Sequence, residues 1–138
     1  MSRSGRNTSI GACTRPSRGC GPLGDSSRQI EQTIPLTPEE YADLTAVPGK
    51  RIEKTRYFYK EAGQAYEIDV CKGALSGLVL VDVEFQSVEK KDEFKAPSWC
   101  LVEVTQENFI AGGMLCGKSY KDIEPNLVRF SYVQPRMK

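Results

Sequence analysis

Two pairs of charged residues have the types and spacing that binding of a metal ion or an anion requires. Asp82 and Glu84 lie two residues apart in the run Leu-Val-Leu-Val-Asp-Val-Glu-Phe, and Lys54 and Arg56 have the same spacing. Alternate side chains of a β-strand point to one face, so each pair would share a face with roughly 6–7 Å between its α-carbons. Carboxylates at that spacing can hold Mg²⁺ or Mn²⁺, and Lys and Arg can bind an anion such as phosphate.

The same alternation also has a purely structural interpretation. An antiparallel sheet with one face in water carries alternating charge without any function. The functional alternative is a curved sheet whose polar face lines a concavity, and the pattern leaves both open. The chain contains no histidine, which excludes histidine-based catalysis and His-containing metal sites. A glycine-rich phosphate loop of the Walker type is also absent from the sequence.

The elements that must position these residues alternate short strands with short helices, which predicts an α+β fold with an antiparallel sheet. Residues 78–85 form the clearest expected strand, with an apolar face opposite the acidic pair. Residues 50–60 and 65–72 predict a β-hairpin with a four-residue loop. Further strands are expected at residues 28–35 and 99–104. Helices are expected from Thr37 with a capping box, from Ser87, from Thr105 towards Met114, and from Ser119 with an interruption at Pro125.

Length and composition set the outer limits. The chain has 138 residues, a formal net charge of +1 and five cysteines. This size predicts one domain, and the balanced charge gives no field that favours nucleic acid or a membrane. Residues 1–20 are basic and free of acidic side chains, so we expect a disordered tail before a domain at residues 21–138. The lack of an N-terminal apolar run and of C-x-x-C pairs favours a cytoplasmic protein with reduced thiols.

Three linked segments carry a family resemblance. They are Glu53-Lys54-Thr55-Arg56-Tyr57, then Tyr66-Glu67-Ile68-Asp69-Val70, then the run from Gly73 to Phe85. In this order and spacing they resemble the second half of a CYTH domain, the triphosphate tunnel metalloenzyme family. The resemblance implies an antiparallel β-barrel open as a tunnel, with short helices outside, of which residues 21–138 would form part. It also implies that linear triphosphates bind inside the tunnel with a divalent metal and are usually hydrolysed there.

The resemblance implies roles for individual residues. Asp82 and Glu84 match the late acidic pair that binds Mg²⁺ or Mn²⁺, and Lys54 and Arg56 match the basic pair that contacts phosphates. The implied substrate is a small triphosphate: tripolyphosphate, ATP or thiamine triphosphate. Neither a nucleic acid polymer nor a membrane is expected as a partner, and no residue is assigned as catalytic. Further candidate tunnel-facing residues are Arg28, Glu31, Glu67, Asp69 and Lys118.

One departure from the family pattern widens the alternatives. The family opens with a strand bearing Glu-x-Glu-x-Lys, and this sequence contains no such motif. A half-barrel would expose sheet edges, so either two chains pair as a homodimer that rebuilds a tunnel or the sequence is a fragment. The functional alternatives are a triphosphatase, a catalytically incomplete phosphate- or nucleotide-binding module, an adenylate cyclase of the class IV type, and a structural partner that completes another chain.

Overall fold

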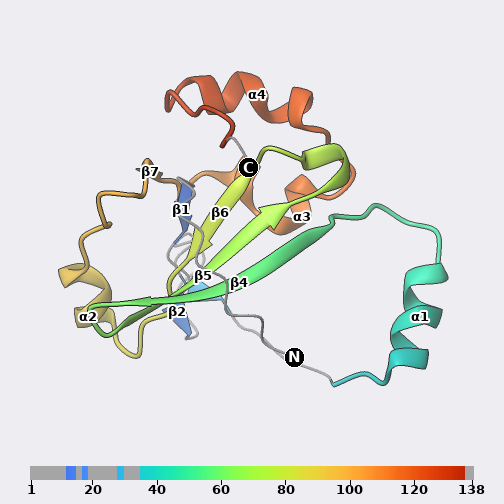
Figure 1. Ribbon diagram of the computed structural model, residues 1–138, viewed down its shortest axis with the longest axis horizontal. Coiled ribbons are helices and arrows are strands. Elements are labelled where there is room, and N and C mark those ends of the chain that lie inside the picture. The colour runs from blue at the N-terminus through green and yellow to red at the C-terminus, as the bar shows by residue number, and fades with distance from the viewer. Residues whose placement is uncertain (1–11, 15–16, 19–27, 30–34, 136–138) are drawn as a thin grey trace.

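The computed structural model describes residues 12–14, 17–18, 28–29 and 35–135. Figure 1 shows its main sheet, which consists of β1 (Ala12–Thr14), β4 (Lys54–Glu61), β5 (Gln64–Cys71), β6 (Val79–Asp82) and β7 (Val102–Glu103). A second sheet pairs β2 (Ser17–Arg18) with β3 (Arg28–Gln29). The helices are α1 (Pro38–Ala46), α2 (Val88–Glu93), α3 (Gly112–Leu115) and α4 (Tyr120–Val128), with 3₁₀ turns η1 (Gly73–Leu75) and η2 (Asn108–Ile110).

Three neighbouring strands of the main sheet, β4, β5 and β6, are antiparallel. β4 pairs with β5 along its whole length, and β5 pairs with β6. This confirms the predicted combination of helices with an antiparallel sheet. β1 pairs in parallel with both β6 and β7, which the sequence did not predict. The strand order β4-β5-β6-β1-β7 leaves β4 and β7 at the edges, so the sheet formed by the described residues is open, and the tunnel barrel stays a prediction.

The β4–β5 hairpin closes with a tighter turn than the sequence predicted. Its strands extend to Glu61 and restart at Gln64, which leaves two turn residues in place of the predicted four. Both of these residues have positive φ, 48° at Ala62 and 81° at Gly63. Two consecutive left-handed residues match the right-handed twist of the flanking strands, which is why two-residue turns of this kind join hairpins. β4 itself begins at Lys54, four residues later than expected.

The apolar face of the sheet confirms the predicted alternation. Val79, Val81, Val83 and Phe85 are all buried in one cluster with alternate residues of β5. Aromatic side chains beyond the strands cover this cluster, and the Trp99 ring packs edge-on against Tyr66 with centroids 5.0 Å apart. The strand expected at residues 99–104 shortens to Val102–Glu103.

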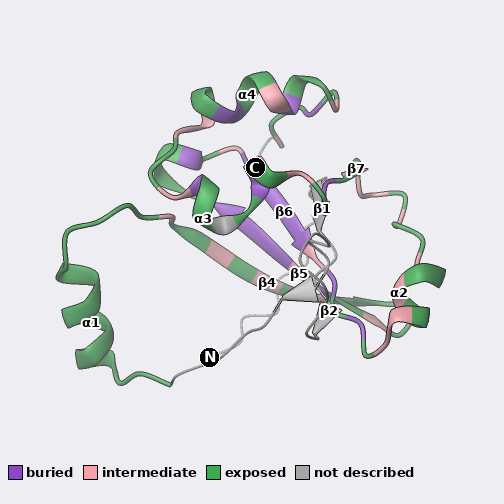
Figure 2. Ribbon diagram, turned by 180° about the vertical axis from the view of Figure 1, so that it is seen from behind, coloured by how far each residue is buried: buried purple, intermediate pink, exposed green. Residues whose placement is uncertain are grey.

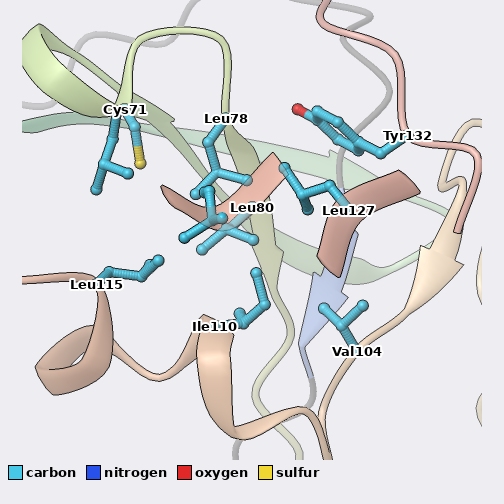
Figure 3. Packing of buried hydrophobic residues seen from close by; sticks show 10 residues of the cluster. Cys71, Leu78, Leu80, Val104, Ile110, Leu115, Leu127 and Tyr132 are labelled. Atoms are coloured by element: carbon cyan, nitrogen blue, oxygen red, sulfur yellow. The ribbon is translucent and has the colours of Figure 1, made fainter. Parts of the chain in front are cut away.

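The opposite face of the sheet is apolar at one end only. There Cys71, Leu78 and Leu80 pack under buried side chains from η2, α3, α4 and the segment after α4 (Figure 3). Figure 2 shows this burial running along β5 and β6 to the covering helices. The Tyr132 hydroxyl donates to the Gly77 carbonyl and accepts from the Val79 N–H, both at 2.9 Å. The C-terminal segment is therefore fixed to β6 by polar as well as apolar contacts.

Three of the four predicted helix starts are present in the structure. The capping box at Thr37 and the N-caps at Ser87 and Ser119 are present. The helix predicted from Thr105 is wrong: the Thr105 hydroxyl donates to Glu103, and only η2 and the short, glycine-initiated α3 follow. The predicted interruption at Pro125 is also wrong, because α4 continues through it. Buried residues on either side of this proline anchor α4 to the core, which outweighs its poor helix propensity.

Several other expectations meet the structure only in part. Cys71 and Cys116 are free, but Cys100 is disulfide-bonded, so the expectation of reduced thiols is wrong at that residue. Most of the predicted tail, residues 1–20, lies outside the described residues, as do residues 30–34 of the strand expected at 28–35.

Among the described helices, none has the length and apolar content to cross a membrane. α1 buries none of its residues and lies apart from the sheet (Figures 1 and 2).

Two neighbouring residues of α4 provide a test of this packing. Leu127 is 1% exposed in the core, whereas Val128 is 66% exposed. We expect Leu127→Ala to lower the free energy of unfolding by about 2–5 kcal/mol, because it removes buried methyl groups and leaves a cavity. Val128→Ala is the matched control and should change it by less than about 0.5 kcal/mol. Urea denaturation measures both; equal effects would contradict the placement of α4 on the sheet.

Candidate functional site

Five charged residues of β4, β5 and β6 lie close together on one face of the sheet. It is the face whose other end is covered by α3 and α4. Strand pairing places Arg56 directly opposite Asp69, and Glu67 directly opposite Asp82. Lys54 lies two residues before Arg56 and therefore shares its face. We call these five residues the charged cluster. The sequence had nominated all five, and the structure brings them together through a continuous series of ion pairs.

Asp69 is the buried centre of the charged cluster, with only 2% of its surface exposed. Its Oδ1 accepts from Nε of Arg56 at 2.7 Å, and its Oδ2 accepts from Nη2 of Arg56 at 2.7 Å and also from Nζ of Lys54. Burial by itself would raise the pKa of this carboxyl. The hydrogen bonds and positive charges of Arg56 and Lys54 outweigh burial, so the pKa of Asp69 lies below its ordinary value and the group stays ionised.

Arg56 connects Asp69 to the two other acids of the charged cluster. Beyond its two bonds to Asp69, it donates through Nη1 to Glu67 and through Nη2 to Oδ2 of Asp82 at 3.3 Å. The hydrogen bond to Asp69 is the main reason that the pKa of Arg56 lies above its ordinary value, despite the opposing effect of burial. One guanidinium therefore links carboxylates from two strands and fixes their relative positions.

Asp82 differs from Asp69 because its surroundings disfavour its charge. Burial and the neighbouring negative charge of Asp69 raise its pKa from 3.8 to about 6, against the opposing effect of Arg56 and Lys54. A carboxylate in this condition gains from any additional positive charge brought close to it. A cation brought close to Asp82 would therefore favour its ionised form and lower its pKa.

The remaining nominated residues lie outside the charged cluster. Glu84 is exposed just beyond β6. Because Val83 and Phe85 pack in the apolar cluster, Glu84 projects to the opposite face of the sheet, which carries the charged cluster and is called the charged face below. Lys118 is exposed between α3 and α4, where its N–H donates to the Leu115 carbonyl. For Arg28 the structure describes the backbone of β3, and Glu31 lies outside the described residues.

A divalent metal fits this face only with ligands from elsewhere. Among the described residues, no group of three or more acidic, cysteine or histidine side chains could hold a metal ion. Both Asp69 oxygens accept bonds from cations, and Glu67 accepts one from Arg56. Of the two acids that the sequence nominated as metal ligands, Asp82 accepts a bond from Arg56 and Glu84 is exposed. One or two carboxylates suffice for Mg²⁺ when substrate phosphates and waters complete its coordination, so residue number and type fit a substrate-bridged metal.

The charge balance of the charged cluster also favours a ligand that brings a divalent cation with it. Its two cations face three carboxylates, and exposed Glu84 adds a fourth negative group nearby. A phosphate anion approaching this face would meet positive charge that the chain's own acids already offset. An accompanying divalent cation would remove that obstacle, because it neutralises carboxylate and phosphate oxygens together.

The central role of Asp69 was the point that sequence reasoning missed. From the resemblance alone, Asp69 is only one of several further tunnel-facing candidates. A signal was present: any hairpin centred on Ala62-Gly63 pairs Arg56 with Asp69, whatever the turn length, and an acid between two apolar strand residues needs such a partner.

The chain is similar to a protein named "Inorganic triphosphatase" from Nitrosomonas europaea, with 43% identity over 85 residues. The matched segment covers 61% of this chain and 56% of that protein, so the chain spans little more than half the length of this relative. No protein-family profile matches the chain. No solved structure matches it either.

Removing the charge at the centre of the cluster should destabilise the fold. We expect Asp69→Asn to lower the free energy of unfolding by about 2–3 kcal/mol, less than for a fully buried pair because both cations are more than a third exposed. Glu67→Gln removes an acid on the same strand and face that is a quarter exposed, and it should cost less than about 1 kcal/mol. Urea denaturation compares them; a larger cost for Glu67→Gln would contradict the central role of Asp69.

The raised pKa of Asp82 predicts a pH dependence of stability. A native pKa above the unfolded value means that the native state binds the proton more tightly, so this contribution to stability is complete below about pH 4 and is lost as the pH rises through about 6. Asp82→Asn keeps the group neutral, so in metal-free buffer this variant should gain stability relative to wild type between pH 4 and 6 and keep a constant difference above pH 7. Urea denaturation at a series of pH values measures the difference; one that does not vary with pH would contradict the shift.

Proposed function

We propose that the chain belongs to the CYTH, or triphosphate tunnel metalloenzyme, family and that it binds and hydrolyses linear triphosphates with Mg²⁺ or Mn²⁺. The observation that carries this proposal is the 43% identity to a protein named inorganic triphosphatase. The charged face supports it, because acidic and basic side chains of the kinds needed for metal and phosphate lie together on adjacent strands. Tripolyphosphate is the first substrate to test, with ATP and thiamine triphosphate after it.

In this proposal Asp82 and Glu84 hold the metal. When bound, the divalent ion offsets the negative charge of the phosphate oxygens and polarises the bond to be broken. Lys54 and Arg56 add fixed positive charge on the same face, so that less reorganisation is needed as charge moves during phosphoryl transfer to water. Asp69 keeps these two cations in place. Glu67 is a further tunnel-facing group, and Arg28, Glu31 and Lys118 remain candidates for the wall.

The proposal includes a tunnel that this chain forms only in part. It is supported by the open edge of the sheet at β4, which pairs on one side only within the described residues. An open edge can accept another strand, from a second copy of the chain or from further sequence. A cytoplasmic location, a small-molecule substrate and the absence of nucleic acid and membrane partners belong to the same proposal.

A binding module without turnover is the second candidate, and one observation favours it. Both cations of the charged cluster are already paired with the chain's own carboxylates. Such a face can hold a metal-bound triphosphate in place without carrying the groups that complete hydrolysis. Affinity without phosphate release would identify this function.

Phosphate release from tripolyphosphate, with Mg²⁺ and with Mn²⁺, tests the proposed activity. The double variant Asp82→Asn/Glu84→Gln should reduce release by more than roughly 10–100-fold, the range seen when only an outer partner of a metal site is lost. Glu93→Gln is the control, because Glu93 is an exposed acid at the end of α2. Cyclic AMP formation from ATP, measured in the same samples, tests the cyclase alternative. Folded wild type that releases no phosphate would exclude the hydrolase.

A further inference from the structure

Phe58 exposes an apolar ring directly beside the charged cluster. It follows Arg56 by two residues on β4, so it lies on the charged face, and it is 52% exposed. Its neighbours Tyr57 and Tyr59 point the other way and pack against the apolar cluster. Among the described residues, neither another ring nor a cation lies against the ring of Phe58. Within this part of the chain, the ring is therefore open to a ligand.

The strand register surrounds this ring with charged and small side chains. Phe58 pairs with Glu67, which pairs in turn with Asp82, so the ring lies in the same cross-strand row as the proposed metal ligand. The next row towards the hairpin turn pairs Lys60 with Ala65, an exposed residue whose side chain is only a methyl group. Ala65 is the diagonal neighbour of Phe58, at about 7–8 Å, and is too small to cover the ring. The surface beside Phe58 is therefore apolar and open.

The packing of the C-terminal helices decides in which direction a ligand can extend. Lys54 pairs with Cys71, which is buried under α3 and α4, so the charged face is covered at that end. From Arg56, β4 continues away from these helices, and Phe58 follows roughly 6–7 Å further along the strand. A triphosphate bound beside Lys54 and Arg56 has room for an additional group towards Phe58, and not towards the covered end.

A planar aromatic group is the chemistry that this surface recognises best. Aromatic rings attract one another in offset-stacked and edge-on arrangements, beyond the gain from burying apolar area. An exposed ring beside a cationic groove is also the arrangement with which proteins hold bases without reading their identity. ATP and thiamine triphosphate both carry planar rings, whereas tripolyphosphate carries none.

We propose that Phe58 is a specificity-determining residue: its exposed ring stacks against a planar aromatic group attached to the triphosphate, so that the site takes aromatic triphosphate esters as well as tripolyphosphate. The inference rests on the proposed function, since the phosphates and the metal occupy the site described above. It assigns a role to a side chain that the spacing of charged residues did not nominate. In the competing arrangement, Phe58 packs against a further part of the tunnel wall and meets no ligand.

A single truncation distinguishes the two arrangements. Phe58→Ala should weaken binding of the hydrolysis-resistant imido analogue of ATP by at least about fivefold, the lower end of the loss when a ring that stacks on a base is removed. Binding of the imido analogue of tripolyphosphate should stay within about twofold of wild type, because it has no ring to lose. Tyr41→Ala is the control, because Tyr41 is 63% exposed on α1, apart from the sheet (Figure 1). Calorimetric titration of the full chain with Mn²⁺ present measures each affinity.

A substitution that keeps an aromatic ring gives a direct optical signal. Phe58→Trp should retain affinity for the ATP analogue, and the fluorescence of the added tryptophan should be quenched when the base stacks on it. The tripolyphosphate analogue should leave this fluorescence unchanged. Wild type provides the background, because its single tryptophan, Trp99, packs with the aromatic residues of the opposite face.

Two results overturn the stacking role while the proposed function stands. The first is a Phe58→Ala variant that loses affinity equally for both analogues, or for neither, since the ring would then support the wall or contact nothing. The second is a Phe58→Trp variant that binds the ATP analogue without quenching. Failure of the proposed function looks different: wild type that binds neither analogue overturns that function and the stacking role together.

Discussion

The buried carboxylate of Asp69 is the constraint on which the charged face depends. A charge removed from water is tolerated only when partners replace its lost solvation, and here Arg56 and Lys54 do so with three donors. This requirement acts together with the register of the hairpin, because a shift of one residue would turn Arg56 to the apolar face and leave Asp69 without it. The tight turn at Ala62-Gly63 holds that register.

One face of the sheet carries both the charged cluster and the apolar side chains that pack under the C-terminal helices, and the two regions adjoin directly. Lys54 pairs across the strands with Cys71, whose thiol is buried in the core under α3 and α4. The pKa of Cys71 is raised to about 11, mainly by burial and then by the negative charge of Asp69. Neither interpretation of the sequence described this arrangement in full. The charged side chains are not simply solvated, since ion pairs join them, and the same face also carries the packing of the C-terminal helices.

Much of this arrangement could be predicted from local sequence, since it follows from period and capping. The alternation in residues 78–85 placed Val81 and Asp82 on opposite faces, and the capping residues placed the starts of α1, α2 and α4. What could not be predicted depends on contacts between distant segments. The parallel pairing of β1 with β6 is of this kind, and so is the continuation of α4 through Pro125. The same holds for the site: spacing nominated the charged residues, but only the three-strand register shows that Arg56 reaches Asp82 as well as Asp69.

The charged cluster has a further property that concerns folding order. All five of its residues belong to one uninterrupted stretch, residues 54–82, whose strands are joined by a two-residue turn and by the short connection through η1. Contacts that are close in sequence require little loop closure and form quickly. The pairing of β1 with β6 and β7 instead joins segments that are far apart in the sequence, since Ala12 pairs with Leu80 and with Val102. The ion pairs of the site can therefore assemble while the rest of the sheet is still forming, so that later elements dock onto a face whose charges are already matched.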